Sequence, residues 1–144
     1  MKTASWILLT VLGVAITVVS MISAYHAYRT DDDYGIGPAR VSRVAAGDPA
    51  IETALRGIRG TSAAFGTAYG VLFLAIVLGP YRRGDVWAWM ALLAGGLTEF
   101  ILVVLRIPIL GTRLGVSAAV TPVIILVIGL LLGVGRLKRD RTVD

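Results

Sequence analysis

Four long apolar stretches divide the sequence, and three of them contain no Asp, Glu, Lys or Arg. The remaining stretch, the third along the chain, contains a single charged residue, Glu99. A helix of about 20 apolar residues is long enough to cross a hydrocarbon core about 30 Å thick. The sequence therefore predicts an all-α fold: one transmembrane domain over residues 1–144, built as an integral membrane four-helix bundle. We place its spans at about 5–27, 60–81, 86–106 and 114–135.

The composition excludes most soluble classes of protein. Apolar residues make up 56% of the chain and charged residues only 16%, with a mean hydropathy of +0.80. A soluble domain of this size usually carries about a quarter charged residues, so the apolar surplus must face lipid. The net charge of +5 comes from residues between and after the apolar stretches, where they contact lipid headgroups. We therefore expect no nucleic-acid partner.

The absence of cysteine excludes disulfides, thiolate metal sites and thiol chemistry. The chain also has one His and no paired carboxylates or glycine-rich phosphate loop, so it lacks the residues that most hydrolytic and redox enzymes use. We expect no catalytic residue, no metal and no obligatory cofactor, although a bound lipid or quinone fits such a protein. A membrane enzyme stays the third hypothesis for its function.

The distribution of basic residues predicts the orientation. Four spans place both termini on one side, and the seven Lys and Arg residues on that side equal the seven on the other. Arg82 and Arg83 lie in a very short turn, and more basic residues cluster in the tail 136–144, so the positive-inside rule places both termini in the cytoplasm. Twelve Arg against two Lys indicate a GC-rich bacterial genome, and hence a multi-pass protein of the bacterial plasma membrane.

The segment 29–59 between the first two spans is predicted to hold a loop and a short interfacial helix. Asp48 followed by a proline is typical of a helix start. Beyond it, Ile51, Leu55 and Ile58 recur on one helical face. This pattern predicts an amphipathic helix at the membrane surface, either separate from the second span or continuous with it despite the glycines between them.

Glu99 is the first candidate for function, because an ionisable group within a span costs on the order of 3 kcal/mol on insertion scales. Gly95 and Gly96 precede it by one turn and allow another backbone to approach, so we expect Glu99 to face the bundle. In antiparallel hairpins, Thr67 of the second span and Thr121 of the fourth lie at its depth.

Thr98 and Ser117 are further members of this polar cluster. Two interpretations stay open. The cluster binds a proton, an ion or the polar head of a lipophilic ligand, or the carboxyl hydrogen-bonds across helices and fixes their packing.

Arg59 and Arg106 come out at equal depth near the outer interface by the same arithmetic. A pair of guanidinium groups there would bind a phosphate or carboxylate headgroup. The alternative is that each side chain extends to water on its own.

Small residues recur at every fourth position in two spans. Ser62, Gly66 and Gly70 form one such ridge and Gly129 and Gly133 the other, and both fit the G-x-x-x-G packing pattern. The hairpin arithmetic places Gly66 and Gly70 at the depth of the glycine pair 95–96, so we expect the second and third spans to pack there.

One stretch resembles a known group. The run Leu55-Arg56-Gly57-Ile58-Arg59-Gly60, the turn Arg82-Arg83 and a third span containing Trp and Gly are loosely similar to small bacterial four-helix membrane proteins of the DoxX-like group. The resemblance covers residues 55–110. Because most members of that group have no assigned function, it implies a fold and no catalytic residue.

Two functional hypotheses follow. In the first, the protein is a non-enzymatic accessory or structural subunit that binds membrane lipids and other membrane protein subunits, or copies of itself, through its glycine ridges. In the second, it is a small transporter or a lipid- or quinone-binding protein that uses Glu99 as a protonatable carboxyl.

Overall fold

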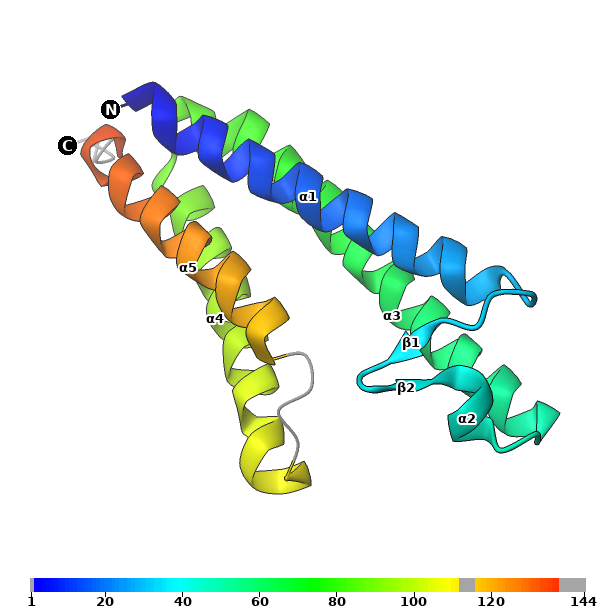
Figure 1. Cartoon of the computed structure of the whole chain (residues 1–144). Helices are drawn as coiled ribbons and strands as arrows, with labels where there is room; N and C mark the ends of the chain where they lie inside the picture. Colours follow the sequence, from blue (N-terminus) through cyan, green and yellow to red (C-terminus); the bar gives the residue numbers. More distant parts are fainter. Residues whose placement is uncertain (1, 112–115, 138–144) are drawn as a thin grey trace. The chain divides into compact units, whose positions relative to one another are not determined.

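The structure is a computed structural model that describes residues 2–111 and 116–137 (Figure 1). The basic tail predicted at 136–144 therefore lies outside the described residues from position 138 onward. Contacts group the chain into two compact units, and each is described by itself. The first unit comprises Met1–Gly13 with Leu72–Asp144, and the second comprises Val14–Val71.

The described chain is almost entirely helical, as predicted. The elements in order are α1 (Lys2–Tyr28), β1 (Gly35–Ile36), β2 (Ala39–Arg40), α2 (Val41–Ala45), α3 (Pro49–Ile76), a π-helical turn (Val77–Tyr81), α4 (Val86–Leu110), α5 (Val116–Gly133) and a 3₁₀ turn (Val134–Arg136). Among the described residues, three helices are long and apolar enough to cross a membrane: Ala4–Tyr28, Pro49–Tyr81 and Val86–Ile109. The fourth apolar helix, Ala119–Gly133, is shorter.

The helix predicted between the first two spans is the first part of α3 and has no break before the span. The side chain of Asp48 accepts hydrogen bonds from the backbone N–H groups of Ala50 (2.8 Å) and Ile51 (3.4 Å), which is the N-cap that the sequence predicts. Glycines at 57 and 60 do not interrupt the helix. Each costs only about 1 kcal/mol in a helix interior, which tertiary contacts offset.

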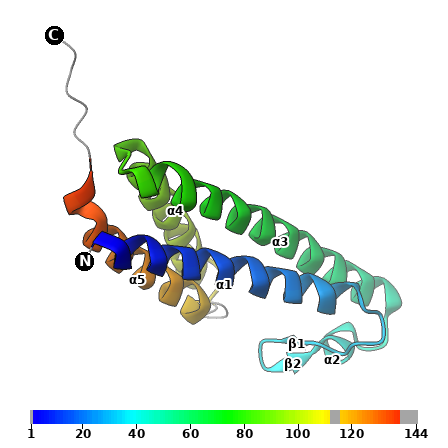
Figure 2. The ribbon, with the colours of Figure 1, turned by 90° about the horizontal axis from the view of Figure 1, so that it is seen from above.

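The loop before α3 contains a hairpin and a short helix that the sequence did not predict. β1 and β2 pair antiparallel, with Gly35 opposite Arg40, and α2 follows directly (Figures 1 and 2). Gly37 has φ +58° at the first position of the two-residue turn, where glycine is favoured. Both the hairpin and α2 are too short to leave a periodic hydrophobic pattern.

In the second unit, the glycine ridge of α3 packs against α1. A Cβ added at Gly70 would lie 2.3 Å from Thr17 Oγ1 and 3.0 Å from the Thr17 backbone nitrogen, and one at Gly66 would lie 2.5 Å from Ser20 Oγ. The expectation that these glycines face the pair 95–96 of the third span is therefore wrong. Ridges of small residues show that a close partner exists, but their spacing is the same whichever helix it is.

In the first unit, α4 packs against α5. A Cβ added at Gly96 would lie 2.1 Å from Leu126 Cδ2, so this glycine allows α5 to approach. On α5, Gly129 faces Leu9 of α1, with 2.5 Å between an added Cβ and Leu9 Cδ2. The indole N–H of Trp89 donates to the Leu130 carbonyl at 3.1 Å and fastens the same pair of helices.

A buried polar contact joins three helix ends in the first unit. Ser5 Oγ lies 2.6 Å from Tyr81 Oη and donates to the Gly129 carbonyl at 2.8 Å. A Cβ at Gly133 would lie 2.0 Å from Tyr81 Oη, so only glycine leaves room for the phenol. The start of α1, the end of the π-helical turn and the end of α5 therefore meet at one end of this unit.

Candidate functional site

The structure places Glu99 on the exposed side of α4. Among the residues that the structure describes, none forms a hydrogen bond or ion pair with its carboxyl. Within the first unit Glu99 is therefore exposed, and the expectation that it faces the rest of the bundle stays a prediction.

The position of Glu99 along α4 explains this exposure. Ala88, Leu92 and Gly96 are buried and recur every four residues. With about 100° per residue, Glu99 projects within about 20° of Ala88 and Leu92, so it shares the direction of the buried residues. It lies beyond Gly96, however, and after Gly96 no described residue of α4 is buried. The sequence shows two adjacent glycines, and only the structure shows which of them carries the contact.

The predicted polar neighbours of Glu99 do not assemble around it in the described residues. Thr98 lies beside it and is exposed, and Thr121 is exposed on α5. Thr67 donates its hydroxyl to the Ala63 carbonyl of its own helix at 2.9 Å. The side chain of Ser117 lies outside the described set, and the half-buried Gly95 adds no polar group.

The small-residue ridges differ in how each member is used. Ser62 at the start of the first ridge is exposed, and its hydroxyl donates to the Ile58 carbonyl at 2.9 Å within α3. The glycines at 66, 70, 129 and 133 all lie against another helix, as described above.

Arg59 and Arg106 have different surroundings. Arg106 is exposed on α4. Arg59 donates to Ser23 Oγ at 3.1 Å and to the Gly35 carbonyl at 3.2 Å, and its guanidinium lies 4.2 Å from the centre of the Tyr34 ring. The two residues belong to different units, so a headgroup site shared by them stays a prediction.

Arg56 is a site that the sequence did not single out. The residue is 9% exposed, and its guanidinium donates to the carbonyls of Arg29 (2.7 Å), Thr30 (3.3 Å) and Asp32 (2.8 Å) in the loop after α1. It also binds Glu52 Oε1 at 2.7 Å, one turn earlier in α3. The spacing of Glu52 and Arg56 was visible in the sequence, but loop carbonyls leave no sequence signal.

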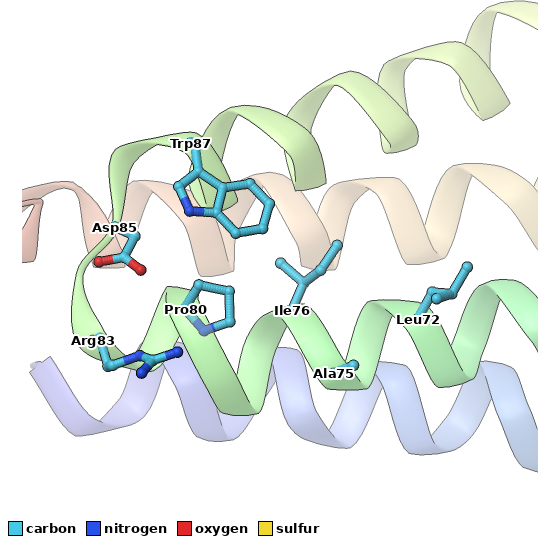
Figure 3. Close-up of a pocket in the computed structure, with 7 residues that line it drawn as sticks. All are labelled: Leu72, Ala75, Ile76, Pro80, Arg83, Asp85 and Trp87. Carbon is cyan, nitrogen blue, oxygen red and sulfur yellow. The ribbon is translucent and has the colours of Figure 1, made fainter.

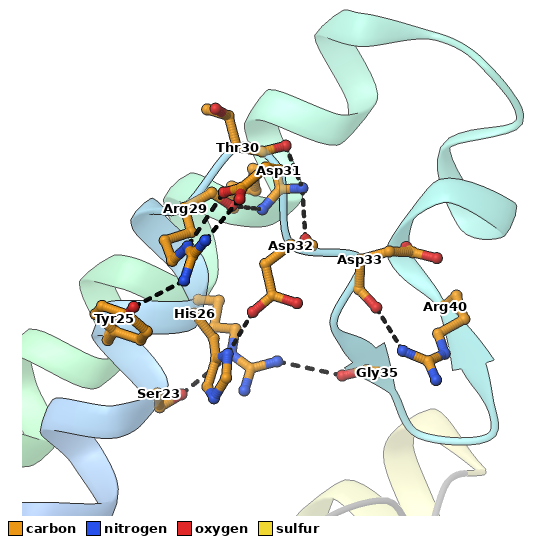
Figure 4. A network of polar contacts seen from close by, with 12 residues as sticks. Ser23, Tyr25, His26, Arg29, Thr30, Asp31, Asp32, Asp33, Gly35 and Arg40 are labelled. Carbon is orange, nitrogen blue, oxygen red and sulfur yellow. Dashed lines mark hydrogen bonds and ion pairs between the residues drawn. The ribbon is translucent and has the colours of Figure 1, made fainter.

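The acidic run of this loop is paired within the protein (Figure 4). Asp31 binds the Arg29 guanidinium with both carboxylate oxygens, at 3.1 and 2.6 Å, and this lowers the pKa of Asp31. Asp32 binds the His26 ring. Among the described residues, no group of His, Asp or Glu side chains could hold a metal ion.

Asp33 caps the first turn of α2, although it lies nine residues before Ser42 in the sequence. Its carboxylate accepts hydrogen bonds from the backbone N–H and the hydroxyl of Ser42, both at 2.9 Å, at the first turn of α2. These bonds favour the ionised carboxylate and lower the pKa of Asp33 below its ordinary value. The three aspartates therefore stabilise the loop through bonds within the protein. The pair of hydrogen bonds from Ser42 to the Asp33 carboxylate is called the Asp33 clasp below.

No protein-family model, curated protein or solved structure matches the chain.

Proposed function

We propose that the chain is a multi-pass integral membrane protein in which α1, α3, α4 and α5 cross the bilayer. The buried contact among Ser5, Tyr81 and Gly129 supports this arrangement, because it brings the start of α1, the end of the π-helical turn after α3 and the end of α5 to one side. Four passes then place both termini on that side. Arg82 and Arg83 follow Tyr81 directly, so the positive-inside rule makes it the cytoplasmic side.

We infer that the protein is a non-enzymatic accessory subunit that binds another membrane protein through α4. The exposed carboxyl of Glu99 carries this proposal. It lies on a surface, here called the Glu99 face, formed by the exposed residues Thr98, Glu99, Leu102 and Arg106. A carboxyl left against lipid is costly, whereas a partner helix that offers a hydrogen-bond donor satisfies it.

The charges of the Glu99 face favour a different protein over a second copy. Copies inserted with the same orientation are related by an axis along the membrane normal. A two-fold interface on this face would therefore oppose Glu99 to Glu99 and Arg106 to Arg106. The matching partner presents a donor at the depth of Glu99 and an acceptor about 10 Å further along, at the depth of Arg106.

The alternative proposal is a transporter or lipophile-binding protein in which Glu99 binds the polar end of a lipid or quinone. The same exposure supports it, because the carboxyl is open to the lipid phase. Glu99→Gln keeps the shape and a donor and acceptor, so a partner would still bind this variant. Loss of ligand binding together with full recovery of protein partners would favour the alternative.

The test is quantitative mass spectrometry of proteins that co-purify with a tagged chain after gentle detergent extraction. Glu99→Leu should reduce the recovery of one specific membrane protein about tenfold, the range of a hydrogen bond to a charged group. Leu131→Ala, at an exposed position of α5, is the matched control and should leave recovery unchanged. Equal recovery with Glu99→Leu, or no enriched membrane protein with the wild-type chain, would refute the accessory role.

A further inference from the structure

A groove lies beside the turn between the π-helical segment and α4 (Figure 3). It has a volume of about 410 Å³ and is lined by Leu72, Ala75, Ile76, Pro80, Arg83, Asp85 and Trp87. Figure 3 shows the two charged side chains at the turn, with Pro80 and Trp87 next to them and the aliphatic side chains further along α3. The groove is therefore polar at one end and apolar along its length.

The two charges at the polar end are not used within the described part of the protein. Arg83 and Asp85 are two residues apart, yet they form no ion pair with each other. Neither side chain has a hydrogen-bond partner among the described residues. Asp85 stands at the N-cap position of α4, but its carboxylate accepts no capping hydrogen bond. The Arg83 guanidinium and the Asp85 carboxylate can therefore both bind a ligand at the polar end of the groove.

The apolar part of the groove has the form of an acyl-chain site. Leu72 is exposed, and Ile76 and Pro80 are partly exposed. Together they extend about 12 Å along the helix. Trp87 is exposed, and Trp side chains concentrate at the membrane–water interface. In the membrane placement proposed above, the turn is at the headgroup level and the aliphatic residues are in the hydrocarbon.

We propose that this groove binds a phospholipid with an ethanolamine headgroup. The lipid phosphate binds the Arg83 guanidinium, the primary ammonium binds the Asp85 carboxylate, and an acyl chain lies along Ile76 and Leu72. This assignment uses the membrane insertion proposed above and is independent of any protein partner at the Glu99 face.

The charge pattern distinguishes this headgroup from its two common alternatives. A choline headgroup has a quaternary ammonium without N–H donors, so it cannot hydrogen-bond the Asp85 carboxylate. A glycerol headgroup leaves a net negative charge on the lipid and offers no cation to Asp85. Of these three headgroups, only ethanolamine supplies a phosphate for Arg83 together with N–H donors for the Asp85 carboxylate.

The test is native mass spectrometry of the purified, delipidated full chain in detergent. It is titrated separately with phosphatidylethanolamine, phosphatidylcholine and phosphatidylglycerol that carry identical acyl chains. We expect phosphatidylethanolamine to bind about two- to fivefold more tightly than either competitor, the range of a partly exposed ion pair. Asp85→Asn should remove this preference, and Arg83→Gln should weaken the binding of all three lipids.

Arg43→Gln is the matched control, since Arg43 is an exposed arginine of α2 outside the groove. It should leave the lipid preference unchanged. Equal binding of the three lipids, preference for phosphatidylglycerol, or no effect of either groove variant would overturn the proposal. The purified chain is measured without a protein partner, so failure of the accessory role would not alter these results. If the chain is found in the membrane fraction of cells but binds the three lipids equally, the lipid site alone is refuted and the membrane insertion stands.

Discussion

Arg56 shows how one side chain can fix a connection between two helices. Its guanidinium has hydrogen-bond partners in the loop after α1 and in α3, and it lies 5.4 Å from the centre of the buried Tyr34 ring. Hydrogen bonds to these partners offset the desolvation free energy of placing the charged guanidinium in a largely buried site. Loop carbonyls that would otherwise need water are satisfied by the same group.

We therefore predict that Arg56→Ala lowers the free energy of unfolding by about 3 kcal/mol, because it leaves the Glu52 carboxylate and three loop carbonyls without their partner. Arg56→Lys should recover less than half of this loss, since an ammonium cannot reproduce the planar fork. The measurement is a chemical unfolding series in detergent. Arg43→Ala, at an exposed position of α2, should have no effect. Equal stability of the Arg43 and Arg56 variants would contradict the prediction.

At this scale the sequence identifies which residues are unusual and gives little on what they contact. Glu99 stands out because it is charged within an apolar stretch. Its exposure depends on where along α4 the helix contact ends, because Glu99 projects within about 20° of the buried Ala88 and Leu92. Arg56 does not stand out, because its partners are backbone carbonyls, which every residue has.

The helices themselves follow closely from the sequence. The predicted start at Asp48 is confirmed, and α4 ends at Leu110, just before Gly111 with φ +63°. This end lies four residues beyond the predicted span end at 106. The prediction followed the length of the apolar stretch, which matches the membrane core, whereas a helix continues until its backbone is capped. The partner helix of each glycine ridge was not predictable, since the spacing is the same for every neighbour.

The glycines of α3 give a paired prediction for helix packing. Gly70→Ala should destabilise the protein by about 1–3 kcal/mol, because the new Cβ would meet the Thr17 backbone as well as its side chain. Gly57→Ala should stabilise it by about 0.5–1 kcal/mol, since nothing lies within 4 Å of that position and alanine favours a helix. Thermal unfolding in detergent measures both. Similar melting temperatures for the two variants would contradict close packing of α1 on α3.

The loop that contains α2 should respond to acid. The pKa of Asp33 is lowered in the folded loop, so the unfolded loop binds a proton more readily, and the ordered state is favoured at neutral pH. That stabilisation is lost as the pH falls below about 4 toward the folded value. A nitroxide at Arg43→Cys should therefore become mobile below pH 4 and stay ordered from pH 5 to 8. Asp33→Asn should be mobile throughout, and a label insensitive to both changes would contradict the clasp.

On the scale of the whole molecule, the proposed function requires membrane insertion with both termini in the cytoplasm. The chain has no native cysteine, so single-cysteine variants report topology directly. Arg43→Cys is suited to the outer side, because this exposed residue is not part of the Asp33 clasp. It should react with an impermeant maleimide added to intact cells, and Thr142→Cys should react only after the membrane is opened. The reverse pattern would invert the orientation.

The most direct test of the accessory role is site-specific photo-crosslinking in the membrane. A benzophenone amino acid at Leu102, on the Glu99 face, should join the chain to one other membrane protein and give an adduct larger than the chain by that partner's mass. The same group at Leu131 of α5 should give no such adduct. Adducts of twice the mass of the chain, or adducts of equal yield from both positions, would contradict a dedicated partner surface on α4.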